Sequence, residues 1–254
     1  MKLLKAMAIA FSIYSKIPVP QFEWKEEDME YMMCFFPWIG GVIGLFFFGW
    51  AVLCEKFAVG NVCYALTGAA IPLMISGGFH VDGYMDTMDA FHSYQSREKK
   101  LEILKDSHIG AFAAIMLALY YMIDIAAISE IHTQKAVSAV AAVFFLARCF
   151  SGIAVMTLQP AKKEGLLYTF ASSAQKVRVK AALYFQAALC VAIMLLVSGW
   201  YGVAAIGAAL LSFFYFKKKS YKELGGITGD TAGFFVTVCE AAAAAAVAVA
   251  GYFL

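Results

Sequence analysis

Long runs of apolar residues, separated by short charged segments, make up most of the chain. A helix needs about 20 consecutive apolar residues to cross the hydrocarbon of a bilayer. The apolar runs cover residues 32–54, 57–79, 109–128, 136–158, 181–216 and 231–254. The run 181–216 is too long for one crossing, and the turn-forming residues 198–202 divide it in two. The pattern therefore predicts an all-α membrane helix bundle with about seven transmembrane helices.

The N-terminal residues 3–14 are also apolar, but they are too few to cross a bilayer, and Pro18 and Pro20 follow them. A cleaved signal peptide is the competing interpretation, because Lys2 and Lys5 flank the start of this run. The small-residue triplet at 8–10 lies inside the run rather than after it. We therefore expect an interfacial or re-entrant segment, and a single integral membrane domain over residues 1–254.

Composition narrows the class of protein. Hydrophobic residues make up 62% of the chain and charged residues only 15%, whereas a soluble domain carries about 25% charged residues. A soluble globular enzyme and a disordered chain are both excluded. The formal net charge of +2 provides no strongly basic face, so nucleic acid is not an expected partner.

The basic residues are distributed unevenly. Of the 20 Lys and Arg residues, 17 fall in segments that alternating spans place on one side of the membrane. These segments are residues 1–31, 80–108, 159–180 and 217–230. The positive-inside rule predicts that this side, with the N-terminus, is cytoplasmic and that the C-terminus lies outside.

Three charged residues, Asp124, Arg148 and Glu240, interrupt the predicted spans. A charged side chain facing lipid costs a few kcal/mol. We therefore expect these residues to face the bundle interior or one another.

The most informative segment is the acidic one within 80–108. Asp82, Asp86 and Asp89 have i, i+4, i+7 spacing, which places them on one face of a helix. Neighbouring carboxylates repel one another, and a divalent cation offsets that repulsion. Mg²⁺ prefers carboxylate oxygens shared with water and substrate phosphate. His80, two residues before this face, is a candidate metal ligand or proton acceptor; the alternative for the whole face is a solvated acidic surface.

Two further segments on the same predicted side have groups that suit phosphate. Lys105, Asp106 and Ser107 precede the span 109–128, where they either bind phosphate oxygens or simply cap the helix. A Gly-rich loop in 217–230 precedes the last span, and its glycines allow backbone N–H groups to approach an anion. Asp230 there is a candidate helix cap or metal ligand. Together the three segments indicate phosphoryl-type transfer at the membrane surface.

The segment Gly77-Gly78-Phe79-His80-Val81-Asp82-Gly83, with Asp86, Thr87 and Asp89, resembles the signature of the adenosylcobinamide-GDP ribazoletransferase (cobalamin synthase) family. Further matches, in family order, are the residues 16–20, Arg97, 105–107, Gly110, Gly226, 228–230 and Glu240. The chain departs from the family pattern at Lys162, where Arg is usual, and at Ala90, where Gly is common.

The resemblance implies the last step in assembling the nucleotide loop of cobalamin, catalysed by a transferase of substituted phosphate groups. The adenosylcobinamide phosphate group passes from adenosylcobinamide-GDP to α-ribazole or its 5′-phosphate, and GMP is released. The implied cofactor is Mg²⁺, and the implied location is the bacterial cytoplasmic (inner) membrane. A homo-oligomer, or a partnership with other cobalamin-assembly enzymes, is left open.

The resemblance also assigns roles to residues. The metal candidates are Asp82, Asp86, Asp89, Asp106 and Asp230. Asp89 or His80 would accept the proton of the attacking hydroxyl. The candidates for holding phosphate oxygens are Arg97, Lys105, Ser107, Gly226, Thr228 and Gly229.

Two other functions compete with this one. A CDP-alcohol phosphotransferase also uses a membrane-embedded acidic motif. When its Asp-Gly pair is aligned on Asp82-Gly83, its first Asp falls on Phe79, which cannot bind metal, and its Ala-Arg pair falls on Asp86-Thr87. The motif therefore does not match this chain. An ion-coupled transporter would relay ions through the charges within the spans, but it leaves the acidic face unexplained.

Overall fold

The computed structural model describes residues 2–20, 23, 25–162 and 164–254, so Lys163 lies outside the described residues. The described chain is helical, and its β pairing is limited to one isolated bridge between Pro160 and Ile227. Two short 3₁₀ helices, Glu26–Met29 and Met32–Cys34, precede the bundle. The α-helices are α1 (Lys2–Tyr14), α2 (Phe36–Phe57), α3 (Asn61–Ser76), α4 (Phe79–His92), α5 (Arg97–Ile103), α6 (Ala111–Ile128), α7 (Gln134–Thr157), α8 (Leu166–Ser173), α9 (Lys176–Ser198), α10 (Trp200–Leu224) and α11 (Gly229–Gly251).

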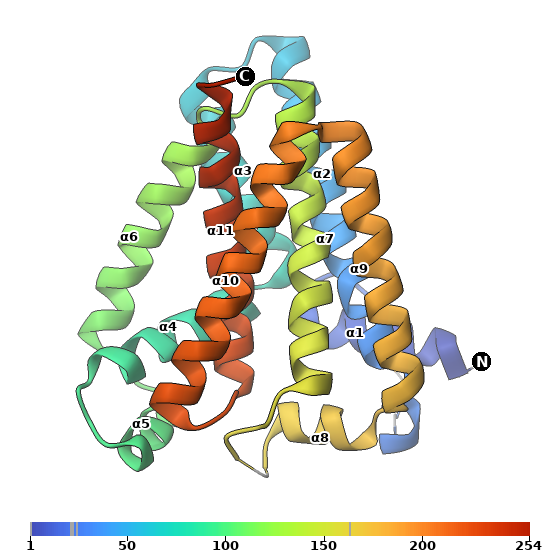
Figure 1. The fold of residues 1–254 in the computed structure, drawn as a ribbon, viewed down its shortest axis with the longest axis vertical. Helices are drawn as coiled ribbons and strands as arrows, with labels where there is room; N and C mark the ends of the chain where they lie inside the picture. The colour runs from blue at the N-terminus through green and yellow to red at the C-terminus, as the bar shows by residue number, and fades with distance from the viewer. Residues whose placement is uncertain (1, 21–22, 24, 163) are drawn as a thin grey trace.

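Six of these helices, α2, α6, α7, α9, α10 and α11, are long and apolar enough to cross a membrane, which confirms the predicted all-α membrane bundle. Helices α7 and α11 are the most buried of the six and form the centre of the bundle (Figure 1). The long run 181–216 breaks where the sequence predicts, at Gly199, whose φ of +56° suits a residue without a side chain.

The span predicted over 57–79 is not a straight crossing. Helix α3 ends at Ser76, and the chain turns by 97° into α4 through Gly77 and Gly78, whose φ angles are +67° and +85°. With 16 residues, α3 extends about 24 Å, which is short of the roughly 30 Å of bilayer hydrocarbon. Six helices are therefore straight crossings, and the bent pair of α3 and α4 makes a seventh span if it is counted as one, in line with the predicted number.

The loop predicted over 217–230 is much shorter in the structure. Helix α10 continues to Leu224, so only residues 225–228 link it to α11. The last turns of α10 are stabilised by Glu223, which pairs with Lys219 at 3.1 Å and also with the buried Lys100 of α5. The pair with Lys219 offsets part of the repulsion within this lysine-rich stretch, and the pair with Lys100 connects α10 to α5.

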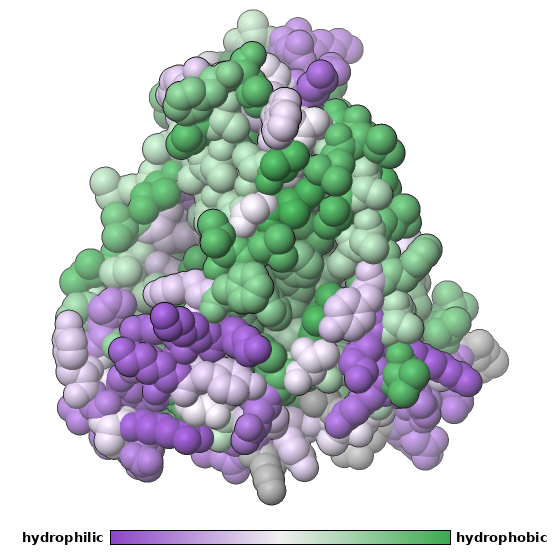
Figure 2. All heavy atoms as spheres, in the orientation of Figure 1, coloured by the Kyte–Doolittle hydropathy of each residue, from purple (hydrophilic) through white to green (hydrophobic). Residues whose placement is uncertain are grey.

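The segments rich in Lys and Arg come together at one end of the bundle, here called the polar end. Helices α4, α5 and α8 lie there, and the C-terminus lies at the opposite end (Figure 1). Figure 2 shows hydrophilic side chains gathered over this end and hydrophobic side chains over the helices beyond it.

The charges within the spans face the interior, as predicted. Arg148 and Glu240 pair at 2.6 Å, and their exposed fractions are 1% and 8%. Asp124 is buried as well. The pair links α7 to α11 in the centre of the bundle.

Candidate active site

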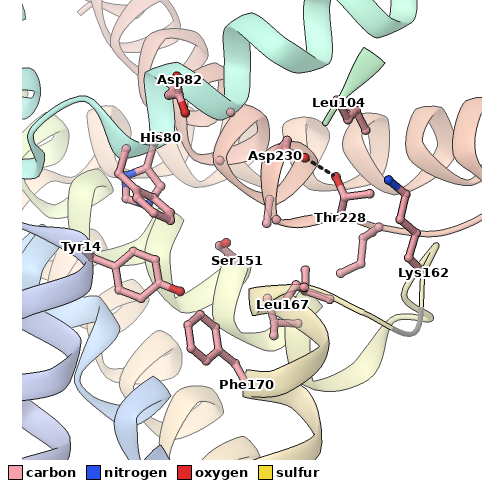
Figure 3. Close-up of a pocket in the computed structure, with 18 of the residues that line it drawn as sticks. Tyr14, His80, Asp82, Leu104, Ser151, Lys162, Leu167, Phe170, Thr228 and Asp230 are labelled. Atoms are coloured by element: carbon pink, nitrogen blue, oxygen red, sulfur yellow. Dashed lines mark hydrogen bonds between the residues drawn. The ribbon is translucent and has the colours of Figure 1, made fainter. Parts of the chain in front are cut away.

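A cavity of about 560 Å³ lies at the polar end, lined by residues of α1, α2, α4, α7, α8 and α11 and of the loops between them (Figure 3). Its volume is in the range of pockets that bind drug-sized ligands. Six of the residues predicted from the sequence line it: His80, Asp82, Lys105, Thr228, Gly229 and Asp230. The cavity is therefore where the three segments predicted from the sequence meet, although the last of them lies more than a hundred residues beyond the other two.

Helices α4 and α11 meet so closely that only glycine fits at their crossing. A methyl group at Gly83 would lie 2.8 Å from the carbonyl oxygen of Asp230, and one at Gly233 would lie 3.1 Å from that of His80. This contact places Asp82 and Asp230 on the same cavity, although they belong to different motifs.

The acidic face of α4 forms as predicted, and its carboxylates influence one another. Burial raises the pKa of Asp86 to about 7, and the charges of Asp82, Asp230 and Asp89 add to the shift. A bound cation would reduce the repulsion among these carboxylates. Within the described part of the chain, no three His, Cys, Asp or Glu side chains stand together as a ready metal site. Mg²⁺ commonly takes only one or two protein carboxylates and completes its shell with water and phosphate, so this donor set fits it.

Asp89 has a different surrounding from the other two aspartates. Its carboxylate oxygens accept hydrogen bonds from the backbone N–H groups of Gly110, at 2.6 Å, and Ala113, at 2.9 Å. Asp89 thus caps the N-terminus of α6 from another helix, and both of its oxygens are engaged. The expectation that Asp106 or Ser107 caps this helix is wrong.

Asp106 instead accepts hydrogen bonds from the backbone N–H and ring Nδ1 of His108, at 3.0 and 2.6 Å, and these bonds lower its pKa. Asp106 and Ser107 are both exposed and do not line the cavity. The structure therefore separates them from Asp82 and Asp230.

Two lysines contribute positive charge to the cavity wall. Lys105 pairs with Glu164 at 2.6 Å, and this hydrogen bond lowers the pKa of Glu164. Lys162, at the family position where Arg is usual, donates to the carbonyl oxygen of Leu101 at 2.7 Å. Burial lowers the pKa of Lys162, and the charge of Lys105 lowers it further.

Arg97 and Gly226 do not line the cavity. They pack against the segments that surround it. A methyl group at Gly225 would collide with the guanidinium of Arg97, which therefore covers the end of α10. A methyl group at Gly226 would lie 2.6 Å from the carbonyl oxygen of Gln159. Because Gly226 has no side chain, the two loops can come close enough to pair. The N–H of Ile227 donates to the carbonyl oxygen of Gln159 at 3.0 Å, and the N–H of Ala161 donates to that of Ile227 at 2.8 Å.

Thr228 begins the last helix. Its hydroxyl accepts a hydrogen bond from the backbone N–H of Thr231 at 3.1 Å and lies 3.4 Å from a carboxylate oxygen of Asp230 (Figure 3). The N-terminus of α11, with Gly229 exposed, therefore opens on the cavity. Helix N-termini favour anions, so this wall suits a phosphate group.

The opposite wall is aromatic, and sequence reasoning missed most of it. Tyr14 of α1 lies 4.5 Å from Phe36 and 6.2 Å from Phe170 between ring centroids, and its ring is parallel to that of His80 at 6.0 Å. Burial raises the pKa of Tyr14, so its hydroxyl stays neutral. Ser151 of α7, 2% exposed, also lines this region. An aromatic residue inside an apolar run carries no signal that distinguishes a cavity wall from a lipid-facing or core position.

His80 belongs to this aromatic wall as well as to the acidic motif. It is 5% exposed, and neither ring nitrogen has a hydrogen-bond partner among the described residues. Buried polar groups in folded proteins are nearly always paired, so this imidazole is open to a ligand.

Comparison with known proteins covers nearly the whole chain. The chain is 44% identical to an adenosylcobinamide-GDP ribazoletransferase of Lachnoclostridium phytofermentans, over 98% of this chain and 95% of the relative. It is 30% identical to the protein of that name from Clostridium botulinum, over 94% of each chain. No solved structure gives a significant match.

These relatives favour neither a CDP-alcohol phosphotransferase nor a transporter. A model of the cobalamin-5-phosphate synthase family matches residues 6–248. The chain therefore belongs to the cobalamin-5-phosphate synthase family.

Proposed function

We propose that this protein is an adenosylcobinamide-GDP ribazoletransferase. A ribose hydroxyl of α-ribazole, or of its 5′-phosphate, attacks the phosphorus that bears adenosylcobinamide. The bond from that phosphorus to the GMP oxygen breaks, so GMP leaves with the electron pair and adenosylcobalamin, or its 5′-phosphate, is formed. The observation that carries the proposal is 44% identity to a relative of that name over almost the full chain.

The cavity offers groups for each part of this reaction. Asp82 and Asp230, which line the cavity, would hold Mg²⁺, and the nearby carboxylate of Asp86 would add negative charge to the site. When bound, the ion supplies positive charge to the pyrophosphate and to the leaving phosphate. Phosphate oxygens are bound by Lys162 and by the backbone N–H groups at the start of α11. Lys105 also binds them once it is released from Glu164.

The proton of the attacking hydroxyl goes to His80 in this scheme rather than to Asp89. His80 lines the cavity, and its ring nitrogens are unpaired within the described residues. The oxygens of Asp89 already accept two backbone hydrogen bonds. A neutral imidazole that lacks a partner is suited to general-base catalysis.

The proposed location is the bacterial cytoplasmic membrane, with the polar end facing the cytoplasm. The distribution of Lys and Arg supports this orientation, because 17 of 20 fall in segments on that side. The nucleotide substrate would then reach the cavity from the cytoplasm.

GMP release by the purified protein in lipid nanodiscs tests the proposal. Wild-type protein should release GMP when adenosylcobinamide-GDP, α-ribazole and Mg²⁺ are all present. Asp82→Ala should lower kcat at least about 100-fold, because the cation that neutralises the reacting phosphate loses a ligand. Glu102→Gln removes an exposed carboxylate that pairs with Lys99 on α5, and it should behave like wild type.

A folded wild-type protein that releases no GMP would overturn the proposal. Release of CMP from a CDP-alcohol would favour the phosphotransferase alternative instead. Full turnover by Asp82→Ala would remove this residue from the metal site but leave the reaction in place.

A further inference from the structure

The cavity has two chemically different ends. One end carries the carboxylates, the lysines and the N-terminus of α11. At the other end, Tyr14, Phe36, Phe79, His80 and Phe170 form a connected set of rings contributed by four helices. Figure 3 shows Tyr14 and Phe170 on one side of the cavity, Lys162 and Thr228 on the other, and Ser151 between them.

The aromatic end also carries hydrogen-bonding groups that have no partner. The hydroxyls of Tyr14 and Ser151 form no hydrogen bond with any described residue, and both side chains line the cavity although they are 7% and 2% exposed. The ring nitrogens of His80 are buried and unpaired in the same part of the structure. The buried, unpaired imidazole and the two hydroxyls beside the cavity point to a ligand with polar atoms at the edge of an apolar body.

We propose that this aromatic end is the binding site for the base of the acceptor nucleoside. The assignment rests on the proposed transferase function and goes beyond it by locating one of the two substrates. A fused, largely apolar aromatic base stacks well on aromatic side chains. A corrinoid is far larger than this part of the cavity, and the guanine nucleotide carries the phosphates that match the polar end.

The arrangement also orients the acceptor. With the base among the rings, its ribose lies where the aromatic and polar ends join, at His80 and Asp82. The attacking hydroxyl then faces both the proposed proton acceptor and the phosphate groups. Phe170 and Tyr14 are therefore specificity-determining residues, and they choose the acceptor by the size and shape of its base.

The test uses the full-length protein in nanodiscs, with α-ribazole as the probe. Phe170→Ala should raise the KM for α-ribazole about tenfold, as expected for loss of one aromatic stacking partner, and leave the KM for adenosylcobinamide-GDP within about twofold. Calorimetric titration of α-ribazole without the second substrate should show the same loss of affinity. Tyr168→Ala is the matched control, because Tyr168 is exposed on α8 and does not line the cavity.

A second readout guards against a variant that fails to fold. The variant Phe170→Leu keeps an apolar side chain and should therefore fold. The preference of this variant for α-ribazole over an analogue with a single-ring base should fall several-fold relative to wild type. An unchanged preference, or equal losses for both substrates, would overturn the subsite assignment while GMP release by the wild type upheld the reaction. Absence of GMP release by the wild type would instead refute the proposed function itself.

Discussion

At the scale of single residues, the three aspartates of the acidic face have divided roles despite their regular spacing. Asp82 lines the cavity, Asp86 is partly buried beside it, and Asp89 is engaged by the backbone of α6. Sequence spacing correctly places all three on one helical face. It does not show which neighbour each carboxylate meets, because that depends on the helix packed against the face.

The raised pKa of Asp86 predicts pH-dependent metal binding. Below pH 7 Asp86 holds a proton that a cation must displace, whereas above pH 7 it is ionised. The apparent affinity for Mg²⁺ should therefore rise by about tenfold between pH 6 and pH 8. The measurement is the Mg²⁺ concentration for half-maximal GMP release, with Mn²⁺ binding followed by electron paramagnetic resonance as a direct check.

Asp86→Asn should flatten this dependence, because the titrating carboxyl is gone. Glu102→Gln serves as the control and should keep the full slope. A slope that is the same in Asp86→Asn as in wild type would show that another group titrates.

At the scale of helices, the site depends on the cap at the start of α6 and on the close crossing of α4 and α11. Asp89 fixes the start of α6 from α4, and Gly83 lets α4 lie against α11. Neither contact is local in sequence. The Gly83 contact holds the acidic face against the N-terminus of α11, and the Asp89 cap holds it against the N-terminus of α6.

Asp89→Ala should destabilise the protein by roughly 1–3 kcal/mol, because two backbone donors at the start of α6 lose their acceptor. Thermal unfolding in nanodiscs measures the effect, and Asp82→Ala should change Tm much less. An Asp89→Ala variant that keeps the wild-type Tm but releases no GMP would instead assign Asp89 to the chemistry, as the sequence motif predicts.

Gly83→Ala should separate α4 from α11, because its new methyl group would lie 2.8 Å from a backbone oxygen that cannot move alone. We expect a lower Tm and at least a tenfold loss of GMP release. Gly207→Ala is the matched control, since a methyl group there meets nothing within 4 Å. Equal behaviour of the two variants would contradict the close crossing.

At the scale of the whole molecule, a buried ion pair connects the two central helices of a largely apolar bundle. The buried pair of Arg148 and Glu240 joins α7 to α11, and α11 carries Asp230 at its N-terminus. The ion pair thus connects the helix that carries Asp230 to the central helix α7.

Glu240→Leu should cost about 3–5 kcal/mol, because it leaves the charge of Arg148 buried without a partner. Combining it with Arg148→Met should recover much of this loss, since no unpaired charge remains. The measurement is Tm in nanodiscs for both variants. A Glu240→Leu protein as stable as wild type would show that water or lipid compensates the arginine.

The sequence by itself determined the class of the protein and the outline of its site. Hydropathy revealed membrane helices, the placement of Lys and Arg distinguished one end, and helical spacing grouped the aspartates, because each of these signals is local in the chain. Only the tertiary structure decided that Asp89 caps α6, that Gly77 and Gly78 break a span, and that Tyr14 and Phe170 wall a cavity. These features arise from contacts between distant segments, and such contacts are set by how the helices pack.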